Sequence, residues 1–421
     1  MNVTGITRNG RSAWPRVAAA MFAAGFGANL FAPMLEVYRE DAGISNPEVT
    51  AMLGVYAFGL VPALIIGGPI SDRRGRRAVL RPAMLVAALG SVVLAGAAGG
   101  QEALLFLGRF IAGAGVGLTM AAGAAWVKEL SADSPTAGPR RATFAISAGF
   151  GGGPLISGLV AQFLPYPEVT PYLVHLLVVA IAAPLMWNVP ETRTPASDAP
   201  EATDAAPGPA ARPGRPPLVP EVALTRRFCW AVAAWAPWVF GTVTCGFAAL
   251  PTLVAGQLHW PIAYFGLIAA VAMLSGAFIQ PWAQRLLEHG WLPLAVVGLG
   301  AASLGMAAAA AAAWLGDPWI ALPVACLLGC SYGIMMVAGL HEVSVIARPD
   351  ELGALIGVFY ALTYLGFFVP FALSLIAPAI GDATGWGRAG GYVACFLAGT
   401  VIAAASAVPV SRVARRGADH P

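Results

Sequence analysis

Twelve long apolar blocks constrain this chain more than any other feature of its sequence. Each block has about 20 residues and little charge, the length that an α-helix needs to cross a bilayer core about 30 Å thick. A single segment in lipid satisfies its backbone hydrogen bonds only as a helix, so every block is expected to be helical. The blocks are Trp14–Leu35, Thr50–Ile70, Val79–Ala98, Leu104–Val127, Ala142–Leu164, Pro171–Val189, Phe228–Leu250, Pro261–Leu287, Trp291–Trp314, Pro318–Leu340, Gly353–Ile376 and Trp386–Val408.

Composition excludes most other classes of protein. Charged residues make up 11% of the 421 residues, whereas soluble chains carry roughly 25%. This deficit excludes a secreted disulfide scaffold, a disordered chain and a nucleic-acid binder, and it predicts an all-α integral membrane protein. The five cysteines lie in apolar stretches without C-x-x-C spacing. We therefore expect no disulfide, metal site or cofactor.

The basic residues predict how the chain is oriented. When alternate loops are assigned to opposite sides of the membrane, 24 Lys and Arg divide unequally. All but three fall on one side; Arg39 and Arg388 fall on the other, and Arg109 lies within a block. Because Lys and Arg accumulate on the cytoplasmic side, both termini are expected in the cytoplasm, with the protein in the cell inner (cytoplasmic) membrane.

A proline-rich stretch divides the blocks into six and six. Nine prolines lie between Pro190 and Pro220, and a segment of this composition cannot build a core. The predicted organisation is an N-terminal six-helix bundle over 1–189, a cytoplasmic linker over 190–225, a C-terminal six-helix bundle over 226–410 and a cytoplasmic tail over 411–421. Two such bundles with substrate bound between them are a plan of secondary transporters.

The loop after the second block carries the most specific motif. It reads G-G-P-I-S-D-R-R-G-R-R from Gly67 to Arg77. This resembles the G-x-x-x-D-R-x-G-R-R loop of the major facilitator superfamily, and with the spans and the linker the resemblance covers nearly the whole chain. It implies the twelve-helix major facilitator fold and a gating role for the matching residues, which are Gly68, Asp72, Arg73, Gly75, Arg76 and Arg77.

Two small-residue patterns extend the resemblance. The fourth block contains R-x-x-x-G-x-G and the fifth contains G-x-x-x-G-P-x-x-x-G. Small residues at this spacing let helices pack closely. In the resembled superfamily the second pattern is associated with antiporters, so the resemblance is closest to the drug:proton antiporter branch. The packing residues are Gly113, Gly115, Gly149, Gly153, Pro154 and Gly158.

Few titratable residues lie inside the blocks. Arg109 is a charge well inside a block and needs a partner, because an unpaired charge in lipid is costly. We expect either a proton- or substrate-sensitive pair of Arg109 with Glu36, or an Arg109 bonded to backbone carbonyls and a Glu36 solvated at the interface. His175 is either a packing histidine or a proton carrier. Glu342 is expected to pair with arginines such as Arg348 at a cytoplasmic gate, with a coupling role as the alternative.

Aromatic side chains with few polar groups suit a bulky, partly apolar organic substrate. The candidate substrate residues are Asn29, Trp235, Trp238, Tyr360 and Tyr364. A positive Arg109 without a deep acid argues against a strongly cationic cargo and is compatible with a neutral or anionic one.

The sequence therefore predicts a secondary active transporter that works by alternating access. It is expected to act as a monomer in the lipid bilayer and to export a small organic compound in exchange for protons. Facilitated or proton-linked uptake of a small neutral or anionic metabolite is the alternative. A membrane enzyme is not expected, because His341 and Glu342 lack the second histidine of H-E-x-x-H, and an ATP-driven pump is excluded because no G-x-x-x-x-G-K-[ST] occurs.

Overall fold

The structure is a computed structural model that describes residues 13–131, 137–192, 220–289, 293–348 and 351–418, with the backbone alone for 412–418. Every regular element in these residues is a helix. Twelve helices in this part of the chain are long and apolar enough to cross a membrane. The predicted all-α class with twelve spans is therefore confirmed.

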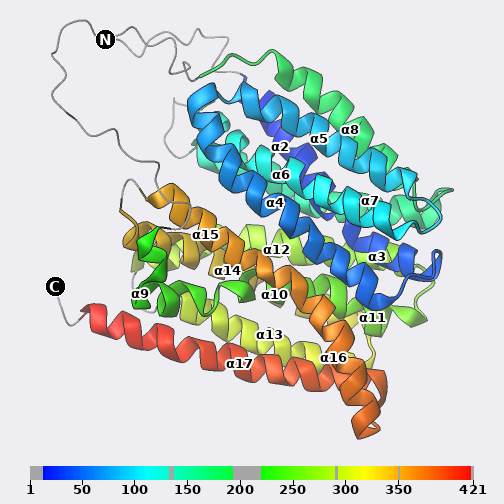
Figure 1. Cartoon of the computed structure of the whole chain (residues 1–421). Helices are drawn as coiled ribbons and strands as arrows, with labels where there is room; N and C mark the ends of the chain where they lie inside the picture. Colours follow the sequence, from blue (N-terminus) through cyan, green and yellow to red (C-terminus); the bar gives the residue numbers. More distant parts are fainter. Residues whose placement is uncertain (1–12, 132–136, 193–219, 290–292, 349–350, 419–421) are drawn as a thin grey trace, which may run out of the picture.

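The first six spans form one group of helices, coloured blue to green in Figure 1. Its elements are α2 (Trp14–Asn29), α3 (Phe31–Glu40), α4 (Asn46–Arg74), α5 (Arg77–Gly96), α6 (Glu102–Leu130), α7 (Ala137–Phe163) and α8 (Thr170–Trp187). Within the group, α6 packs against α4 and α5, and α2 packs against α7. Ser45 begins α4 with a capping box, in which its side chain and that of Glu48 each accept a backbone hydrogen bond of the other.

The last six spans form the second group, coloured green to red in Figure 1. Its elements are η2 (Glu221–Leu224), α9 (Arg226–Phe228), η3 (Cys229–Ala233), α10 (Ala236–Thr244), η4 (Cys245–Ala249), α11 (Pro251–Val254), η5 (Ala255–Gln257), α12 (Pro261–His289), α13 (Leu294–Leu315), α14 (Pro318–Ile346), α15 (Leu352–Tyr364), η6 (Leu365–Phe368), α16 (Val369–Thr384) and α17 (Gly387–Ala418). Helix α17 continues to Ala418, through most of the segment expected to be a tail. Residues 193–219 of the predicted linker lie outside the described residues.

Prolines accompany breaks in two of the spans. A proline has no amide for the carbonyl four residues earlier, and its ring crowds that carbonyl. The carbonyl four residues before Pro33 is that of Asn29, where α2 ends. The carbonyl four residues before Pro370 is that of Gly366, which lies within η6. Ser157 of α7 donates a hydrogen bond of 2.9 Å to the carbonyl of Leu30 at the first of these breaks. Helix α7, in contrast, runs without interruption through Pro154.

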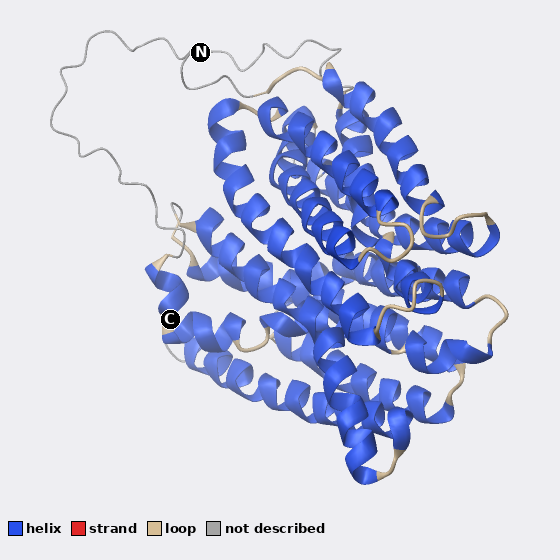
Figure 2. Cartoon of the chain, turned by 45° about the vertical axis from the view of Figure 1, so that its right-hand side comes forward, coloured by secondary structure: helices blue, strands red, loops and turns tan. Residues whose placement is uncertain are grey.

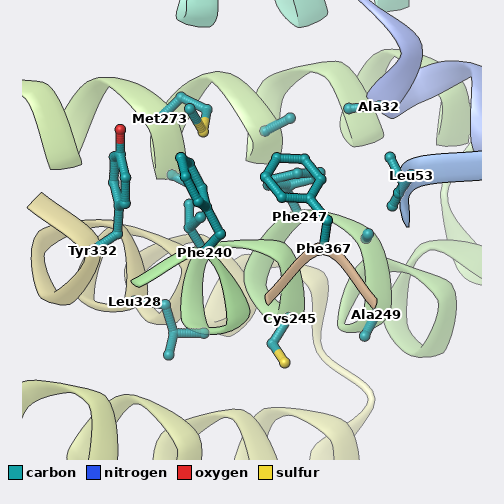
Figure 3. Packing of buried hydrophobic residues seen from close by; sticks show 14 of the residues in the cluster. Ala32, Leu53, Phe240, Cys245, Phe247, Ala249, Met273, Leu328, Tyr332 and Phe367 are labelled. Atoms are coloured by element: carbon teal, nitrogen blue, oxygen red, sulfur yellow. The ribbon is translucent and has the colours of Figure 1, made fainter. Parts of the chain in front are cut away.

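The spans run between two faces of the molecule, and Figure 2 shows their connecting loops at the ends of the helices. We call the face where α2 begins and α17 ends the terminal face; it also carries the turn between α4 and α5. We call the other face the opposite face. The two groups meet through α7 with α12 and α4 with α15 and α16. The largest buried apolar cluster crosses this interface, where Leu53 and Ala32 lie beside Phe247 and Phe367 (Figure 3).

Candidate functional site

A cavity of about 720 Å³ lies between the two groups at the terminal-face end of their interface. Helices α2, α4, α6, α7 and α15 contribute its walls. The lining residues are Met21, Leu64, Ile65, Gly68, Pro69, Asp72, Met120, Ala121, Ala124, Ala125, Lys128, Pro139, Ala142, Thr143, Ile146, Gly353, Ala354, Ile356, Gly357 and Tyr360.

The walls of the cavity are mainly apolar. Asp72 and Lys128 are its charged lining residues, and both lie near the terminal-face ends of their helices. Thr143 and Tyr360 add hydroxyl groups. Among the predicted site residues, the cavity brings together Gly68, Asp72 and Tyr360. Such a wall accommodates an organic molecule with apolar surface and few polar groups. No group of three potential metal ligands occurs in the described part of the chain.

The motif loop is organised around the buried guanidinium of Arg76. Its Nη1 donates hydrogen bonds of 2.9 Å to Ser71 and to Asp72, and its Nη2 donates one of 2.7 Å to Glu129 at the end of α6. Burial alone would lower the pKa of Arg76, but the hydrogen bonds and negative charges of Glu129 and Asp72 outweigh it and raise this pKa above the ordinary arginine value. Arg76 therefore stays charged and ties α4 to α6.

Glu191, which follows α8, braces the same loop. Its carboxylate accepts hydrogen bonds of 3.0 Å from the amide of Arg76 and 2.9 Å from the amide of Arg77. Gly75 has a φ of +94°, and a Cβ there would lie 2.6 Å from Glu191 Oε2, so this position requires glycine. Arg73 is exposed. Sequence reasoning missed Glu129 and Glu191. An acid two residues after the end of an apolar block is a weak signal for both.

Aromatic side chains pack between the groups beyond the cavity. The ring of Phe240 stacks on Tyr364 at 4.6 Å and contacts Phe367 at 5.0 Å, and Tyr56 of the first group reaches Phe367 at 5.9 Å. Figure 3 shows the side chains of Tyr332, Phe240 and Phe367 near one another in the buried cluster. Tyr364, a predicted substrate residue, therefore lies buried in this cluster.

Arg109 is buried without an acidic partner among the described residues. Its Nε donates a hydrogen bond of 3.3 Å to the carbonyl of Met52, and Nη1 has no partner. The guanidinium carbon lies 4.3 Å from the ring centre of Phe31 and 4.4 Å from that of Tyr56. Two aromatic faces and a carbonyl thus hold this charge. The predicted pairing with Glu36 is not present in this structure, and the alternative with backbone bonding describes Arg109 correctly.

Glu36 instead pairs with Arg39, one turn further along α3. Neighbours three residues apart share one side of a helix, so the pair is local. Glu36 is 5% exposed, and the expectation that it would be solvated at the interface is wrong. Helix α3 packs against α12 of the second group, and the Arg39 guanidinium lies 5.9 Å from the ring centre of Phe265.

His175 is a buried, hydrogen-bonded residue of the first group. Its Nδ1 lies 2.6 Å from the hydroxyl of Ser91, and its Nε2 lies 3.1 Å from the carbonyl of Ala23. Only a donor can bond a carbonyl, so the neutral ring carries its proton on Nε2 and accepts from Ser91. Asn29 donates a hydrogen bond of 3.4 Å to the carbonyl of Phe150 and links α2 to α7.

The remaining candidates lie away from the cavity. Trp235 is completely buried, and its indole N–H donates to the carbonyl of Ala231. Trp238 is partly buried, and its ring lies next to Gly399 of α17, where an added Cβ would contact it. Glu342 forms no ion pair with Arg348 or any other residue that the structure describes. The predicted pairing of Glu342 is therefore wrong for this conformation. Arg348 lies beyond the end of α14 and six residues after Glu342, not at the spacing of three or four residues that brings side chains together on a helix.

The predicted packing glycines mark close contacts between helices. A Cβ on Gly113 would lie 2.1 Å from the carbonyl oxygen of Tyr56, and one on Gly115 would lie 2.8 Å from the amide of Ala87. Gly149 and Gly153 face α2, since their Cβ atoms would lie 2.3 Å from the carbonyl oxygens of Phe22 and Phe26. These glycines pack helices of the first group against one another.

Gly158 and Pro154 lie at the interface between the two groups. A Cβ on Gly158 would lie 2.9 Å from Cα of Gly266, and one on Gly266 would lie 2.4 Å from the carbonyl oxygen of Pro154. Close to them, the side-chain oxygen of Gln162 accepts from the amides of Ile262 at 3.0 Å and Ala263 at 3.3 Å, in the first turn of α12.

Further polar contacts join the groups near the opposite face. Asn46 donates to the hydroxyl of Tyr392 at 3.3 Å, and the hydroxyls of Thr50 and Ser374 are 3.2 Å apart. The interface is therefore held together near the opposite face and contains the cavity near the terminal face.

A bundle of twelve membrane-length helices in two groups, with a cavity at one end of their interface and polar contacts at the other, defines a polytopic membrane protein of the transporter class. The sequence matches the Major Facilitator Superfamily over residues 17–371, and the protein belongs to that superfamily. The superfamily prediction is thus confirmed.

One curated relative and several solved structures are similar to the chain. Over 92 residues the chain is 29% identical to the bacillibactin exporter of Bacillus subtilis (strain 168); the match spans 21% of this chain and 23% of that protein, less than a quarter of its length. A nucleoside transporter superposes with a TM-score of 0.72 at 12% identity, covering 96% of this chain and 100% of the other. A bacterial homologue of the human lysosomal transporter Spinster, in an inward-facing and unoccupied conformation, has a TM-score of 0.64 at 14% identity, with 97% and 96% covered. These structures support the fold.

Proposed function

We propose that the protein exports a small, partly apolar organic compound from the cytoplasm by alternating access, in exchange for protons. The cavity at the terminal face is the observation that carries the proposal. The terminal face also bears the arginines of the motif loop, so by the distribution of basic residues it is the cytoplasmic face. In this conformation the cavity takes its cargo from the cytoplasm. The likeness to the bacillibactin exporter supports the outward direction.

The cavity wall sets the chemistry of the cargo. Leu64, Met120, Ile146 and Ile356 supply apolar surface, whereas the charged groups Asp72 and Lys128 lie near the terminal face. A cargo with an apolar body buries its surface against these walls, and its polar groups remain near the entrance or bond to the hydroxyl of Tyr360.

Glu36 is the proton site in this proposal. Among the described residues it is the carboxylate-bearing side chain buried in a span, and its helix packs against α12 across the interface. Protonation removes the negative charge from Glu36 and weakens its pair with Arg39. When the opposite face opens, this group becomes accessible to external protons, which couples proton uptake to the conformational change.

Everted membrane vesicles test the proposal directly. A transported compound should dissipate a preformed proton gradient, and a broad panel of organic compounds without any such effect would refute export by antiport. A pump-deficient host that expresses the protein identifies the compounds to assay, because its growth in the presence of a toxic substrate should improve.

The variant Glu36→Gln tests the proton site. It should abolish proton-driven export while retaining exchange of labelled for unlabelled substrate, since exchange needs no net proton movement. Glu40→Gln is the matched control, because Glu40 lies on the same helix and its side chain is 66% exposed. Undiminished proton-driven export by Glu36→Gln would place the proton site elsewhere.

Uptake of a small neutral or anionic metabolite is the second candidate function. Arg109 favours it, since Nη1 of this buried cation has no partner in the described structure and a substrate anion would supply one. Right-side-out vesicles decide between the candidates: accumulation of an organic anion driven by an inward proton gradient supports uptake, and gradient-driven loss supports export.

A further inference from the structure

A second open groove of about 630 Å³ lies at the terminal face, on the outside of the first group. It is separate from the cavity between the groups. We call it the arginine groove; it is lined by Arg74, Arg77, Ala78, Arg81, Pro82, Leu85, Trp187 and Glu191, from the end of α4, the first turns of α5 and the segment that ends α8.

The groove has a cationic end with positioned guanidinium groups. Arg81 donates to the carbonyl of Trp187 from both Nε and Nη2, and its guanidinium lies 5.1 Å from the ring centre of Trp187. Arg77 donates from Nε to the carbonyl of Val189 at 2.6 Å. These contacts fix two guanidinium groups while leaving N–H donors on each, so little conformational entropy is lost when they bind an anion.

Charge in the groove favours an anion. Three arginines face one acid, Glu191, whose oxygens already accept the amides of Arg76 and Arg77. The guanidinium of Arg74 is exposed and makes no ion pair with the described residues. The first turn of α5 also lies here, where the helix dipole favours negative charge. Arginine forms bidentate hydrogen bonds with phosphate oxygens.

The other end of the groove leads into an apolar seam. Helices α5 and α8 pack together, and both helices also expose large apolar side chains. On α5 these are Leu85 at 60% and Leu89 at 51% exposure, and on α8 they are Ile181 at 57% and Leu185 at 47%. Within a bilayer this seam contacts hydrocarbon chains. A cationic end joined to an apolar seam matches an amphiphile with a phosphate headgroup.

We propose that the arginine groove binds an anionic phospholipid, with its headgroup phosphate on Arg74, Arg77 and Arg81 and an acyl chain along the seam between α5 and α8. Basic pockets at the ends of transmembrane helices recognise anionic headgroups in this way. The lipid bridges α4, α5 and α8 beside the motif loop. Its binding does not depend on the identity of the transported compound.

Native mass spectrometry of the purified full chain in detergent tests the proposal with phosphatidylglycerol and phosphatidylcholine of identical acyl chains. Phosphatidylglycerol should bind more tightly, and affinity should fall about fivefold for each arginine replaced in Arg74→Gln and Arg81→Gln, since each contributes about 1 kcal/mol near an anionic surface. The matched control is Arg141→Gln: Arg141 lies 4.3 Å from the ring centre of Trp14, an arginine–tryptophan contact of the same kind outside the groove. Equal binding of the two lipids, or equal losses in the control variant, would overturn the proposal.

Three further measurements keep the proposal testable if a variant folds poorly. A photoreactive phosphatidylglycerol should crosslink to the wild-type chain between Ala78 and Leu85, and crosslinks found only elsewhere would contradict the site. Glycerol phosphate at equal phosphate concentration should not displace the lipid; displacement would mean that the groove takes free phosphate. Replacement of Asp198, Glu201 and Asp204 by their amides should leave lipid binding unchanged, and a severalfold increase would mean that this acidic segment occupies the groove.

Discussion

At the scale of single residues, the protein stabilises a positive charge inside a membrane span with two aromatic rings and a backbone carbonyl. Arg109 lies between the rings of Phe31 and Tyr56 and bonds to the carbonyl of Met52. A desolvated cation–π contact contributes about 2 kcal/mol, whereas an unpaired ion inside a bilayer costs more. The ring of Tyr56 also touches Phe367 of the second group. The ring of Tyr56 therefore links the buried charge of Arg109 to the interface between the two groups, which must rearrange during transport.

The two substitutions Tyr56→Phe and Tyr56→Leu separate the ring from the hydroxyl. Tyr56→Phe keeps the ring and should change the unfolding free energy by less than about 0.5 kcal/mol. Tyr56→Leu removes the cation–π contact and should cost about 1–2 kcal/mol beyond the packing loss. Thermal unfolding of both purified variants measures the difference. Equal stability of the two variants would show that the Tyr56 ring does not hold Arg109.

The sequence predicts which residues are exceptional better than it predicts their partners. Arg109 stands out because it is a charge in an apolar block, but chain position does not reveal which groups from α3 and α4 surround it. Glu36 lies close to Arg39 in sequence, and local helix geometry pairs them before any distant arginine can compete. Glu129 and Glu191 were missed because their contacts with Arg76 span 53 and 115 residues of sequence.

At the scale of elements, glycine spacing determines which helices approach each other. Positions 113 and 117 of α6 face α4, whereas position 115 faces α5, so one helix packs against two neighbours through alternate glycines. The sequence could predict that these glycines pack helices. It could not predict that Gly158 differs from Gly149 and Gly153, because all three share one pattern while only Gly158 faces α12 of the other group.

Two glycines of different motifs form a matched pair for mutation. In Gly113→Ala the added Cβ would lie 2.1 Å from the carbonyl oxygen of Tyr56, so α4 and α6 must move apart. We expect a loss of about 1–3 kcal/mol in unfolding free energy. Gly68→Ala is the control, because no atom lies within 4 Å of its Cβ. Thermal unfolding compares the two; a loss as large in Gly68→Ala would contradict the packing argument.

Gln162 acts as a cap between elements of different groups. Its side chain accepts two amides of the first turn of α12, which have no partner within their own helix. Gln162→Leu preserves the approximate size and removes both hydrogen bonds, which together contribute about 1–3 kcal/mol. The balance between conformations should shift toward opening at the opposite face by roughly five- to 150-fold, since about 1.4 kcal/mol is a factor of ten in an equilibrium.

Spin labels on Asp41→Cys and Trp386→Cys, in a Cys229→Ser background, report this opening. Pulsed distance measurements should gain a longer component in Gln162→Leu. The control is Gln257→Leu, an exposed residue near the same face whose side chain forms no hydrogen bond with the described residues. An unchanged distance distribution in Gln162→Leu would show that the cap does not hold the opposite face closed.

At the scale of the whole molecule, the helix count and the class of fold follow from apolar block length alone, because lipid leaves helices as the way for isolated segments to cross. The conformation does not follow from the sequence. The same contacts between α7 and α12 must form and break during a transport cycle, so one sequence encodes at least two arrangements of its groups. The position of the cavity in one arrangement depends on which end of this interface is closed, and that is a balance between weak contacts such as Asn46–Tyr392 and Thr50–Ser374.

Access to the cavity from one side provides the final prediction. A cysteine at Thr143, which lines the cavity, should react with a membrane-impermeant maleimide in everted vesicles and be protected in intact cells, in a background without the five native cysteines. Asp41→Cys near the opposite face should show the reverse pattern. Adding Gln162→Leu to Thr143→Cys should slow labelling in everted vesicles severalfold, because molecules open at the opposite face hide the cavity wall from the terminal face. Labelling of Thr143→Cys in intact cells alone would reverse the proposed orientation, and labelling that is unaffected by Gln162→Leu would separate the cavity from the movement of the two groups.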